Sequence, residues 1–477
     1  MKASELAATI GAARHGDDVE IADVVLDSRS VPAGSLFCCV PGAVHDGHDF
    51  AAAAVEAGAV ALLCERTLDL PVPQLLVADV RTSMAAAAAA VFGDPSAGLD
   101  VVGVTGTNGK TTVVAMVTAV LEHAGRHPRE IGTLTGVRTT PEAPDLQRLL
   151  AGFRDEGVDA VAMEISSHAL DLHRVDALHV DVGVFTNLGI DHLDFHGTQE
   201  AYFAAKARLF EPGRCRVGVV NVDDLHGRLL VDAGGDELRR VSAADASDVV
   251  TTRRGSAFTW RGRRVELPMP GAHNVMNALL AAEACVALEV DEDVIAAGLA
   301  ALPPVPGRFE SFGGDGAPVV IVDFAHTPDA LEHAIGTARS LLDPRGRLTV
   351  VFGCGGDRDR GKRPMMGEVA CSAADQVVVT TDNPRSEDPE AIIAEIVAGC
   401  AGTPTVVVDR RAAIERAIHA AGSDDIVLVA GKGHEQGQVV GDRVLPFDDR
   451  EVVRSALAGL GDAGAPTNER TNDGTDR

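Results

Sequence analysis

Two kinds of hydrophobic pattern alternate along this chain. Short runs rich in β-branched residues, such as 101–104 and 182–186, are typical of buried parallel strands. Longer stretches rich in Ala and Leu, such as 84–92, have the composition and spacing of helices. Strands that alternate with helices are the signature of α/β architecture, so the pattern predicts an α/β protein with parallel sheets.

Turn-forming residues divide the pattern into three blocks. The cluster Asp94-Pro95-Ser96 precedes the strand at 101–104, and the densest proline cluster, at 303–307, blocks helix continuation. We therefore predict domains at 1–98, 99–306 and 307–461, followed by a disordered tail at 462–477 that lacks large apolar residues. The third domain is predicted to be a doubly wound sheet. Its expected strands are 319–322, 348–352, 376–380, 405–408 and 426–430.

Charge and composition exclude several classes of function. The 477 residues carry 42 basic and 70 acidic side chains, for a net charge of −28, and aromatic residues make up only 3%. Such a chain is repelled by phosphate backbones and lacks stacking platforms, so nucleic-acid binding is not expected. No signal-peptide core and no uncharged run of about 18 apolar residues occurs, so membrane insertion is not expected either.

The cysteines favour a reducing compartment. The chain has 8 cysteines and no CxxC pair, and the adjacent Cys38 and Cys39 lie in a predicted strand where a disulfide between them is disfavoured. We therefore expect a cytoplasmic protein with reduced thiols.

The strongest chemical signal is a glycine-rich turn between a strand and a helix. The strand at 101–104 is followed by Thr105-Gly106-Thr107-Asn108-Gly109-Lys110-Thr111-Thr112. Backbone N–H groups of such a turn and the following helix N-terminus bind phosphate, with Lys110 on the β- and γ-phosphates and Thr111 on magnesium. Val104 stands where the general pattern has glycine, so the loop is a shortened variant. The alternative is a tight turn with an incidental lysine, but the strand–turn–helix context favours nucleotide binding.

An acidic and histidine-rich cluster follows. Glu164 lies at the end of the predicted strand 158–165, where a carboxylate can reach a metal beside the phosphate loop. His192 and His196 are four residues apart and would share one face of a helix, as zinc ligands do. Their glycine-flanked context favours a loop, so magnesium with phosphate is preferred over zinc. Lys206, in the predicted helix 201–210, is by itself an ordinary solvated helix charge.

Together with further segments, these motifs resemble the Mur ligase family. The matches occur in the same order along the whole chain except its tail. The resemblance implies a UDP-sugar-binding first domain, a central P-loop ATPase-like domain and a Rossmann-like third domain that delivers an amino acid. The segments are 105–112, 164–168, 191–197 with Lys206, 271–277, 305–308, 323–328 and 431–435.

The resemblance also implies an activity. Members of the family join a carboxylate to an amine at the expense of ATP through an acyl phosphate. Segments 26–29, 353–364, 382–385 and 431–435 resemble members that add meso-diaminopimelate to UDP-N-acetylmuramoyl-L-alanyl-D-glutamate. This implies an ADP-forming ligase of peptidoglycan synthesis, with a part in cell shape and cell division. Its expected partners are small-molecule substrates, and the protein is expected to be a monomer.

By resemblance, the phosphate loop and its surroundings take specific roles. Lys110, His192 and Lys206 are the implied catalytic residues, with Lys206 as a carbamate whose oxygens suit a hard cation better than an ammonium does. The implied magnesium ligands are Thr111, Glu164, His192 and the Lys206 carbamate. The implied ATP-binding residues are Gly106, Thr107, Asn108, Gly109, Lys110, Thr111, Thr112, Asn274, Arg308 and Asp323. Asn274 has a second interpretation as a helix N-cap, because an apolar helix follows it.

Two further sets are implied for the other substrates. Arg138 and Leu172 depart from residues that some relatives carry, so neither is assigned a contact. The UDP-substrate set is Leu26, Ser28, Ala43, Val44, His45, Thr139, Thr140, Ser166 and Arg174. The diaminopimelate set is Arg358, Asp382, Asn383, Pro384, Arg385, Gly431 and Glu435.

The choice of amino acid depends on one arginine. Lysine and meso-diaminopimelate differ by a distal carboxylate, which Arg385 can bind through two parallel hydrogen bonds at the end of a strand. A plain proline-containing turn would need no arginine there. Two alternatives remain open. One is another Mur-type or folylpolyglutamate-type ligase, most specifically a lysine-adding enzyme, and the other is a non-catalytic nucleotide-binding switch that needs Lys110 and Thr111 but not Lys206, His192 or an amino-acid pocket.

Overall fold

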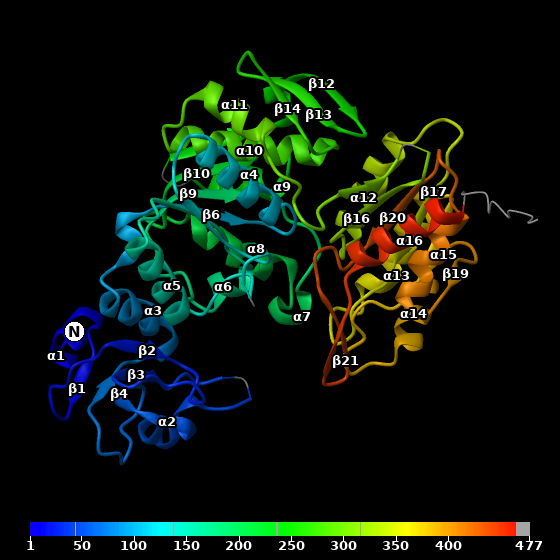
Figure 1. Ribbon diagram of the computed structural model, residues 1–477. Helices are drawn as coiled ribbons and strands as arrows, with labels where there is room; N and C mark the ends of the chain where they lie inside the picture. Colours follow the sequence, from blue (N-terminus) through cyan, green and yellow to red (C-terminus); the bar gives the residue numbers. More distant parts are fainter. Residues whose placement is uncertain (43, 137, 235–236, 315, 464–477) are drawn as a thin grey trace, which may run out of the picture. The chain divides into compact units, whose positions relative to one another are not determined.

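The computed structural model describes residues 1–42, 44–136, 138–234, 237–314 and 316–463, which form two compact units. Unit 1 consists of Met1–Gly189 and Phe195–Pro303, and unit 2 consists of Ile190–Asp194 with the chain from Pro304 onward (Figure 1). Both units mix helices with largely parallel sheets, so the predicted α/β class is confirmed. The predicted first domain and most of the predicted central domain fall within unit 1, and the three domain boundaries stay a prediction.

A five-stranded sheet forms the N-terminal part of unit 1, in the order β1-β5-β4-β3-β2. Helices α1 and α3 pack on one face through Leu6 and Met84, and α2 packs on the other through Ala54. The predicted helix at 84–92 is the second half of α3. The elements are α1 (Ala3–Ile10), β1 (Ala13–His15), β2 (Asp23–Val25), β3 (Ser35–Cys38), α2 (Ala51–Ala57), β4 (Ala59–Cys64), β5 (Gln74–Leu76) and α3 (Val80–Val91).

The central sheet of unit 1 has six strands, all parallel, in the order β11-β10-β9-β6-β8-β7. Its strands are β6 (Asp100–Thr105), β7 (Pro128–Ile131), β8 (Ala160–Glu164), β9 (Val180–Phe185), β10 (Cys215–Asn221) and β11 (Glu237–Val241). Because β6, β8 and β9 are adjacent and parallel, their carboxyl ends meet at one edge. Three segments far apart in the sequence therefore lie side by side there.

Helices cover both faces of this central sheet (Figure 1). One face is packed by α5 (Ala143–Asp155), α6 (Ser167–Asp171), α8 (Gln199–Ala207) and α9 (Leu225–Ala233). On the other side lie α4 (Lys110–His123), α10 (Ala272–Ala287) and α11 (Glu292–Ala300). An antiparallel sheet of β12 (Ala246–Thr252), β13 (Gly255–Trp260) and β14 (Arg263–Leu267) completes the unit, and the short helix α7 is Leu193–His196.

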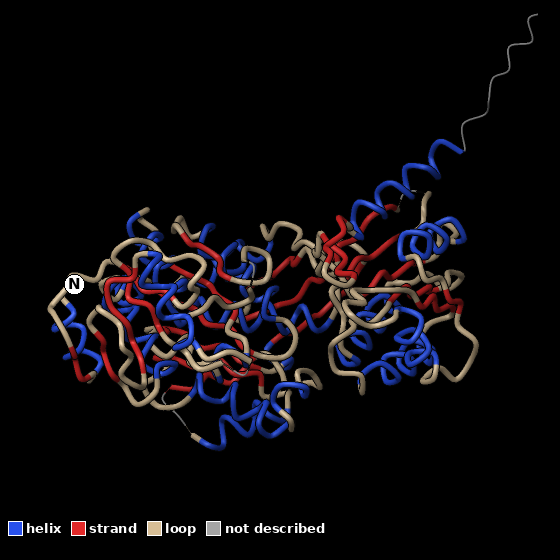
Figure 2. The backbone as a smooth tube through the Cα atoms, turned by 90° about the horizontal axis from the view of Figure 1, so that it is seen from below, coloured by secondary structure: helices blue, strands red, loops and turns tan. Residues whose placement is uncertain are grey.

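Unit 2 is built on a six-stranded sheet in the order β15-β16-β20-β17-β18-β19. All five predicted strands occur, and the antiparallel β15 adds an edge strand that the sequence reasoning missed. The strands lie between α12–α14 on one face and α15 and α16 on the other (Figure 2). The strands are β15 (Glu310–Gly313), β16 (Val319–Asp323), β17 (Leu348–Phe352), β18 (Gln376–Val379), β19 (Thr405–Val406) and β20 (Ile426–Ala430), with a hairpin of β21 (Gly437–Val440) and β22 (Arg443–Pro446). The helices are α12 (Pro328–Ser340), α13 (Lys362–Ala373), α14 (Pro389–Val397), α15 (Arg410–Ala420) and α16 (Asp449–Ala463).

A buried ion pair stabilises the carboxyl ends of two strands in unit 2. Arg410 and Asp449 are both fully buried at 0% side-chain exposure and lie 2.6 Å apart. Arg410 also donates to the carbonyl oxygens of Thr381 and Ala430, at the ends of β18 and β20. Removing one partner of such a pair leaves an uncompensated buried charge, which typically costs about 3–5 kcal/mol. The pair therefore holds in place the two loops that leave these strands.

The cysteines depart from the expectation of reduced thiols at one position. A disulfide joins Cys371 of α13 to Cys400, which follows α14. No local pattern predicts this disulfide, because the two cysteines are 29 residues apart and meet only when α13 packs on α14. The other cysteines of the described residues, including Cys38 and Cys39, are free and buried.

The C-terminal boundary also shifts slightly. Helix α16 continues to Ala463, so Asp462 and Ala463 are helical rather than part of the predicted disordered tail. Residues 464–477, the rest of that tail, lie outside the described residues. Within the part of the chain that the structure describes, no helix is both long and apolar enough to cross a membrane.

Candidate active site

The predicted phosphate loop connects β6 to α4 and adopts a conformation that depends on its glycines. Gly109, at the N-terminus of α4, has φ +88°, in the left-handed region that disfavours residues with a Cβ. A Cβ there would lie 2.6 Å from Asn277 Oδ1, and one at Gly106 would collide with Thr186 Oγ1. Both glycines are therefore required for the loop to fold closely against its neighbours.

The two site lysines of unit 1 meet at this loop. Lys110 Nζ donates to the carbonyl oxygens of Gly106 and Thr107, each at 2.9 Å. Lys206 Nζ donates to the same Gly106 oxygen at 2.8 Å, and it lies 4.4 Å from the centre of the Tyr202 ring. Lys206 is 1% exposed, so its interpretation as a solvated helix charge is wrong. The fold therefore places Lys206, which is distant in sequence, beside the loop where phosphate is expected to bind.

The loop is held from β9 by residues that sequence reasoning missed. Asn187, directly after Thr186, accepts the Asn108 N–H through Oδ1 at 3.0 Å and the Thr107 N–H through its carbonyl oxygen at 2.9 Å. The Tyr202 hydroxyl lies 3.1 Å from Thr107 Oγ1. The position of Asn187 at the end of a strand beside β6 was the available signal.

Glu164 supplies a buried carboxylate at the same edge. It is 2% exposed, and its Oε1 accepts from Thr111 Oγ1 at 3.0 Å and from the Thr133 N–H at 2.8 Å. A carboxylate beside a threonine hydroxyl offers the hard oxygen ligands that Mg²⁺ prefers. The structure thus brings together Thr111 and Glu164, two of the implied magnesium ligands.

The two histidines belong to different units, so the zinc pair that their spacing allows is not tested. His196 Nε2 lies 2.9 Å from Ser167 Oγ, and its ring packs on Tyr202. His192, with φ +55°, belongs to the segment Ile190–Asp194 of unit 2, so its placement beside Glu164 stays a prediction. Among the described residues, no group of three or more His, Cys, Asp or Glu side chains is arranged to hold a metal by itself.

The implied UDP-substrate residues fall into two groups, the first of which adjoins Glu164. Thr140 Oγ1 donates to the Glu164 carbonyl oxygen at 2.8 Å and accepts the Ser166 N–H at 3.1 Å. Arg174 donates to the Thr140 carbonyl oxygen and pairs with Glu142 at 2.8 Å. Burial lowers the pKa of Arg174, although Glu142 opposes this effect. Thr139 lies beside this group, 3.2 Å from Thr133 Oγ1.

The second group lines a cavity of about 740 Å³ within unit 1. Leu26, Ser28 and His45 lie on its wall, together with Arg138. Val44 is 84% exposed, and Ala43 lies outside the described residues. The remaining lining residues are Asp27, Arg29, Phe37, Gly47, Phe50, Gly136, Pro141, Glu142 and Asp145.

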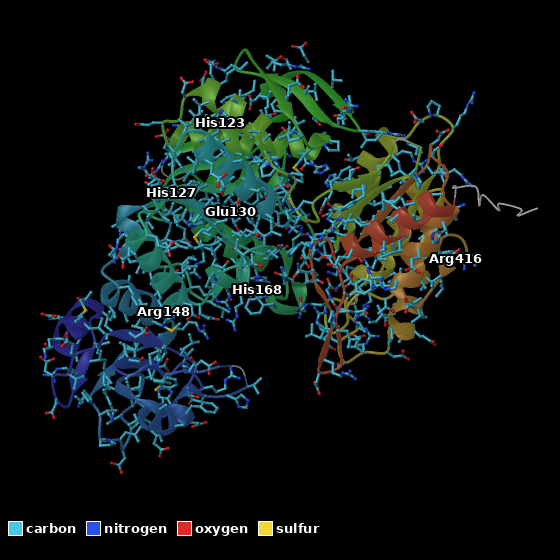
Figure 3. The ribbon with its side chains drawn as sticks, viewed as in Figure 1. His123, His127, Glu130, Arg148, His168 and Arg416 are labelled. Atoms are coloured by element: carbon cyan, nitrogen blue, oxygen red, sulfur yellow. A yellow bond between two sulfur atoms is a disulfide. The ribbon has the colours of Figure 1, made fainter. Side chains whose placement is uncertain are left out.

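Arg148 joins helix α5 to strand β2 near this cavity. It extends from α5 and donates to Asp23 Oδ1 at 2.7 Å and to the Val24 carbonyl oxygen at 2.9 Å (Figure 3). Arg138 pairs with Glu142, and both residues are part of the cavity wall. The cavity is therefore formed by residues of both the predicted first domain and the predicted central domain.

The implied nucleotide residues outside the phosphate loop lie in both units. Asn274 is buried in unit 1 and donates to the Pro270 carbonyl oxygen at 2.8 Å. Its N-cap interpretation is wrong, because Gly271 caps α10. In unit 2, Asp323 accepts the Phe309 N–H at 2.7 Å, and the Arg308 guanidinium lies 4.5 Å from the centre of the Phe324 ring. Burial raises the pKa of Asp323, and Arg308 partly offsets this effect.

Asp191, beside His192, forms a buried charge cluster in unit 2. Its carboxylate lies 3.7 Å from His326 Nε2 and 3.6 Å from Lys362 Nζ. Burial alone would raise the pKa of Asp191, but His326 and Lys362 outweigh it and hold that pKa well below its usual range. Lys362 was not identified from the sequence.

Two arginines meet at the carboxyl edge of the unit 2 sheet. Arg385, with φ +50°, donates through Nη1 to the Gly356 carbonyl oxygen at 2.6 Å. A Cβ on Gly355 would lie 2.8 Å from Arg385 Nη1 and 3.7 Å from Arg358 Cγ, so both side chains pass close to this glycine. Burial lowers the pKa of Arg385, and the charge of Arg358 lowers it further. The structure therefore brings together two cations, of which Arg385 is partly buried and Arg358 is exposed, an arrangement that favours an anionic ligand.

The carboxylate of Glu435 and two hydrogen-bond donors lie next to these arginines. Asn383 Nδ2 donates to Glu435 Oε2 at 2.8 Å, and Lys432 Nζ donates to the same oxygen at 2.7 Å. Lys432 is 0% exposed and also donates to Asn383 Oδ1 at 3.0 Å. Both internal donors contact Oε2, so they fix the Glu435 carboxylate in one orientation.

The other implied residues of this set line the same edge. Gln438 donates to the Asp382 carbonyl oxygen, and Pro384 leads directly into Arg385. Gly431 has φ +114°, and a Cβ there would lie 2.6 Å from Asp382 Oδ2. All seven residues of the implied diaminopimelate set thus lie on the loops that follow β17, β18 and β20. Lys432 is the functional candidate that sequence reasoning missed here.

Comparison with known proteins identifies the family. Residues 20–102 match the Mur ligase family catalytic domain, 104–285 the Mur ligase middle domain and 307–433 the Mur ligase glutamate ligase domain. A Geobacillus kaustophilus protein named UDP-N-acetylmuramoyl-L-alanyl-D-glutamate–2,6-diaminopimelate ligase is 43% identical over 471 residues, with 93% of this chain and 96% of that protein covered. The chain belongs to the Mur ligase family.

Other Mur ligases agree with this assignment. A Streptomyces avermitilis protein of the same name is 44% identical, with 95% of this chain and 96% of that protein covered. A solved structure of a UDP-N-acetylmuramoyl-L-alanyl-D-glutamate–2,6-diaminopimelate ligase is 33% identical with a TM-score of 0.66, covering 92% of this chain and 95% of that chain. As a Mur ligase the chain is an enzyme of the ligase class, which removes the interpretation as a non-catalytic nucleotide-binding switch. None of these relatives is named as a lysine-adding enzyme, so that alternative is not favoured.

Proposed function

We propose that this Mur ligase adds meso-diaminopimelate to UDP-N-acetylmuramoyl-L-alanyl-D-glutamate, with ATP converted to ADP and phosphate. The observation that carries the proposal is the pairing of Arg358 with Arg385 beside Glu435. Two cations next to a fixed carboxylate match an amino acid whose far end carries both a carboxylate and an ammonium. The names of the similar Mur ligases support the same substrate.

The reaction takes place in two group transfers. A carboxylate oxygen of the UDP-substrate attacks the γ-phosphorus of ATP, the bond from that phosphorus to the β–γ bridging oxygen breaks, and ADP leaves. The amine of diaminopimelate then attacks the acyl carbon, the bond to phosphate breaks, and the amine gives up a proton as the amide forms. Lys110 and the N–H groups of the phosphate loop stabilise the charge that develops on the transferring phosphoryl group.

The residues around Glu164 fit a magnesium site. Thr111, Glu164, His192 and a carbamate on Lys206 are proposed to hold Mg²⁺, because carboxylate, carbamate and hydroxyl oxygens suit a hard cation. When bound, Mg²⁺ would neutralise phosphate charge. The buried position of Lys206 supports a modified side chain, since conversion of its cationic ammonium into an anionic carbamate would remove the repulsion between that ammonium and Mg²⁺.

The remaining implied residues of these two sets are proposed to bind ATP and the UDP-substrate. ATP is proposed to contact Gly106 to Thr112, with Asn274, Arg308 and Asp323 at its nucleoside end. The UDP-substrate is proposed to occupy the cavity beside Leu26, Ser28 and His45 and to extend toward Thr140, Ser166 and Arg174. The enzyme is proposed to act in the cytoplasm as a monomer, in a role that supports cell-wall synthesis and cell division.

An ADP-release assay tests the proposed function. Purified enzyme receives UDP-N-acetylmuramoyl-L-alanyl-D-glutamate, ATP and Mg²⁺ with meso-diaminopimelate, with L-lysine or with no amino acid. We expect ADP release to depend on diaminopimelate and the tripeptide product to appear by mass spectrometry. Equal rates with L-lysine would instead favour the lysine-adding alternative, and ADP release without any amino acid would contradict ligation.

The carbamate on Lys206 leads to a specific prediction. Lys206→Ala is expected to lose most ligase activity, and short carboxylic acids such as acetate are expected to restore part of it by replacing the missing oxygens. Activity is measured with and without added acid, and melting temperature shows whether the variant folds. A fully active Lys206→Ala enzyme would contradict the carbamate, and so would clear electron density for an unmodified Lys206 ammonium in a crystal of active, magnesium-bound enzyme.

A further inference from the structure

Two loops of unit 2 carry the arginines proposed to bind the distal carboxylate, and the inference below rests on that proposed function. The first loop, residues 353–361, follows β17 and carries Arg358. The second, residues 382–387, follows β18 and carries Arg385. Because β17 and β18 are parallel neighbours, both loops leave the same edge of the sheet. Arg385 crosses from the second loop to the first, where its Nη1 donates to the Gly356 carbonyl oxygen.

The two guanidinium groups repel each other. Among the ion pairs of the described residues, none includes Arg358 or Arg385. The charges of Asp382, Glu435 and Asp357 only partly offset the effect of burial and of Arg358 on the pKa of Arg385. Like charges stay together only when the surrounding structure holds them, and here Arg385 is partly buried while Arg358 is exposed. The main chain of each loop must therefore be fixed by other contacts.

Five polar side chains join the two loops, and we call them the clasp: Asp357, Arg363, Ser386, Glu387 and Glu395. At its exposed end, Ser386 donates its hydroxyl to Asp357 Oδ1 at 2.7 Å and its N–H to Oδ2 at 3.1 Å. The Asp357 N–H donates to Glu387 Oε1 at 2.6 Å. Each of these bonds joins a residue adjacent to Arg358 with one that follows Arg385.

Arg363 forms the buried end of the clasp. Its side chain is 0% exposed and donates to Glu387 at 2.7 Å and to Glu395 at 2.7 Å. It also donates to the Gly355 carbonyl oxygen at 3.1 Å. One planar guanidinium thus contacts the first loop, the second loop and helix α14, which a lysine ammonium would not reproduce.

We propose that the clasp fixes the spacing of Arg358 and Arg385 and thereby selects amino acids with a second carboxylate. The clasp residues are positioning residues, because their polar groups contact one another and the loops rather than a ligand. When the clasp is weakened, the two arginines separate and no longer bind the distal carboxylate together. L-Lysine makes no such contact, so its use is not expected to change.

Kinetics of variants at the exposed end test this proposal. Ser386→Ala and Asp357→Asn are each expected to raise the KM for meso-diaminopimelate about three- to tenfold. The kcat at saturating amino acid and the KM for ATP are expected to stay within about twofold. The double variant is expected to show less than the product of the single effects, because both substitutions remove the same contacts. Arg363→Lys is expected to raise the same KM at least as much.

Asp375→Asn is a matched control in the same unit. Asp375 accepts from Arg339 at 2.6 Å and from the Leu348 N–H at 2.7 Å, at the amino ends of β17 and β18 and so at the opposite edge of the sheet. A purely structural effect lowers the melting temperature in both sets of variants but leaves the kcat/KM ratio of diaminopimelate to L-lysine unchanged. The proposal requires that ratio to fall in the clasp variants and not in the control.

The outcomes separate this inference from the proposed function. If the wild-type enzyme uses diaminopimelate and the clasp variants keep the wild-type ratio, the clasp does not select the substrate and the inference is overturned alone. If the wild-type enzyme shows no diaminopimelate-dependent ADP release, the proposed function is overturned and the clasp inference with it.

Discussion

Replacing Lys110 with alanine is expected to lower ligase kcat by at least about 10²–10³-fold, the usual cost of removing one positioned donor to a developing charge. Lys110 Nζ lies against the Gly106 and Thr107 carbonyl oxygens at 2.9 Å, directly over the loop that is proposed to hold the phosphates. Its side chain does not fill an apolar core, so the fold should survive. The measurement is ADP release with all substrates at saturation, with melting temperature recorded in parallel.

Lys2→Ala provides the control for this variant. Lys2 is exposed at the N-terminal end of unit 1 and has no part in the proposed site. We expect the control to keep wild-type activity. A folded Lys110→Ala enzyme with near-native kcat would show that the loop is a structural turn and not a phosphate site.

Arg385→Ala is expected to remove most of the preference for meso-diaminopimelate over L-lysine. A desolvated arginine that meets no carboxylate is an unpaired charge, and loss of one side of such a pair typically costs about 2–5 kcal/mol. This corresponds to a factor of about 30 to several thousand in kcat/KM. The wild-type enzyme should therefore reject lysine by this factor, because lysine leaves Arg358 and Arg385 without an anion. Truncation of Arg385 should raise the KM for diaminopimelate and leave the KM for ATP unchanged.

A competition assay with both amino acids measures this preference, and Arg385→Lys refines it. The lysine variant keeps the charge but loses the planar fork, so it should recover only part of the selectivity. Arg416→Ala, on the exposed surface of α15, is a suitable arginine control (Figure 3). If the wild-type enzyme incorporates L-lysine with a kcat/KM comparable to that for meso-diaminopimelate, the loop at 382–385 does not recognise a distal carboxylate.

Much of the architecture was predictable because it is local. The runs at 101–104, 348–352 and 426–430 became β6, β17 and β20 with little change at their ends. Buried parallel strands must be apolar on both faces, so their sequence pattern is strong. Edge elements such as β15 and the hairpin β21–β22 were missed, since they are half-exposed and carry a weaker pattern.

The scarcity of lysine was a signal that sequence reasoning did not use. The chain has only five lysines, and four of them, Lys110, Lys206, Lys362 and Lys432, lie in the candidate site regions. Lys206, Lys362 and Lys432 are all buried. A chain that uses arginine for most of its basic positions places lysine where a compact ammonium, or its chemical modification, is required. This criterion would have identified Lys362 and Lys432 without a structure.

Local patterns in the chain specify which residues follow the ends of the strands, and with them the phosphate loop, Glu164 and the loops that carry Arg358 and Arg385. Which of these loops meet depends on the packing of distant segments. The insertion of β6 between β8 and β9, and of β20 between β16 and β17, brings distant strand ends together. The burial of Lys206, the Arg410–Asp449 pair, the Cys371–Cys400 disulfide and the clasp all depend on that order. Strand order is set by the packing of the whole sheet rather than by any local pattern, which is why no segment of the sequence encodes these contacts alone.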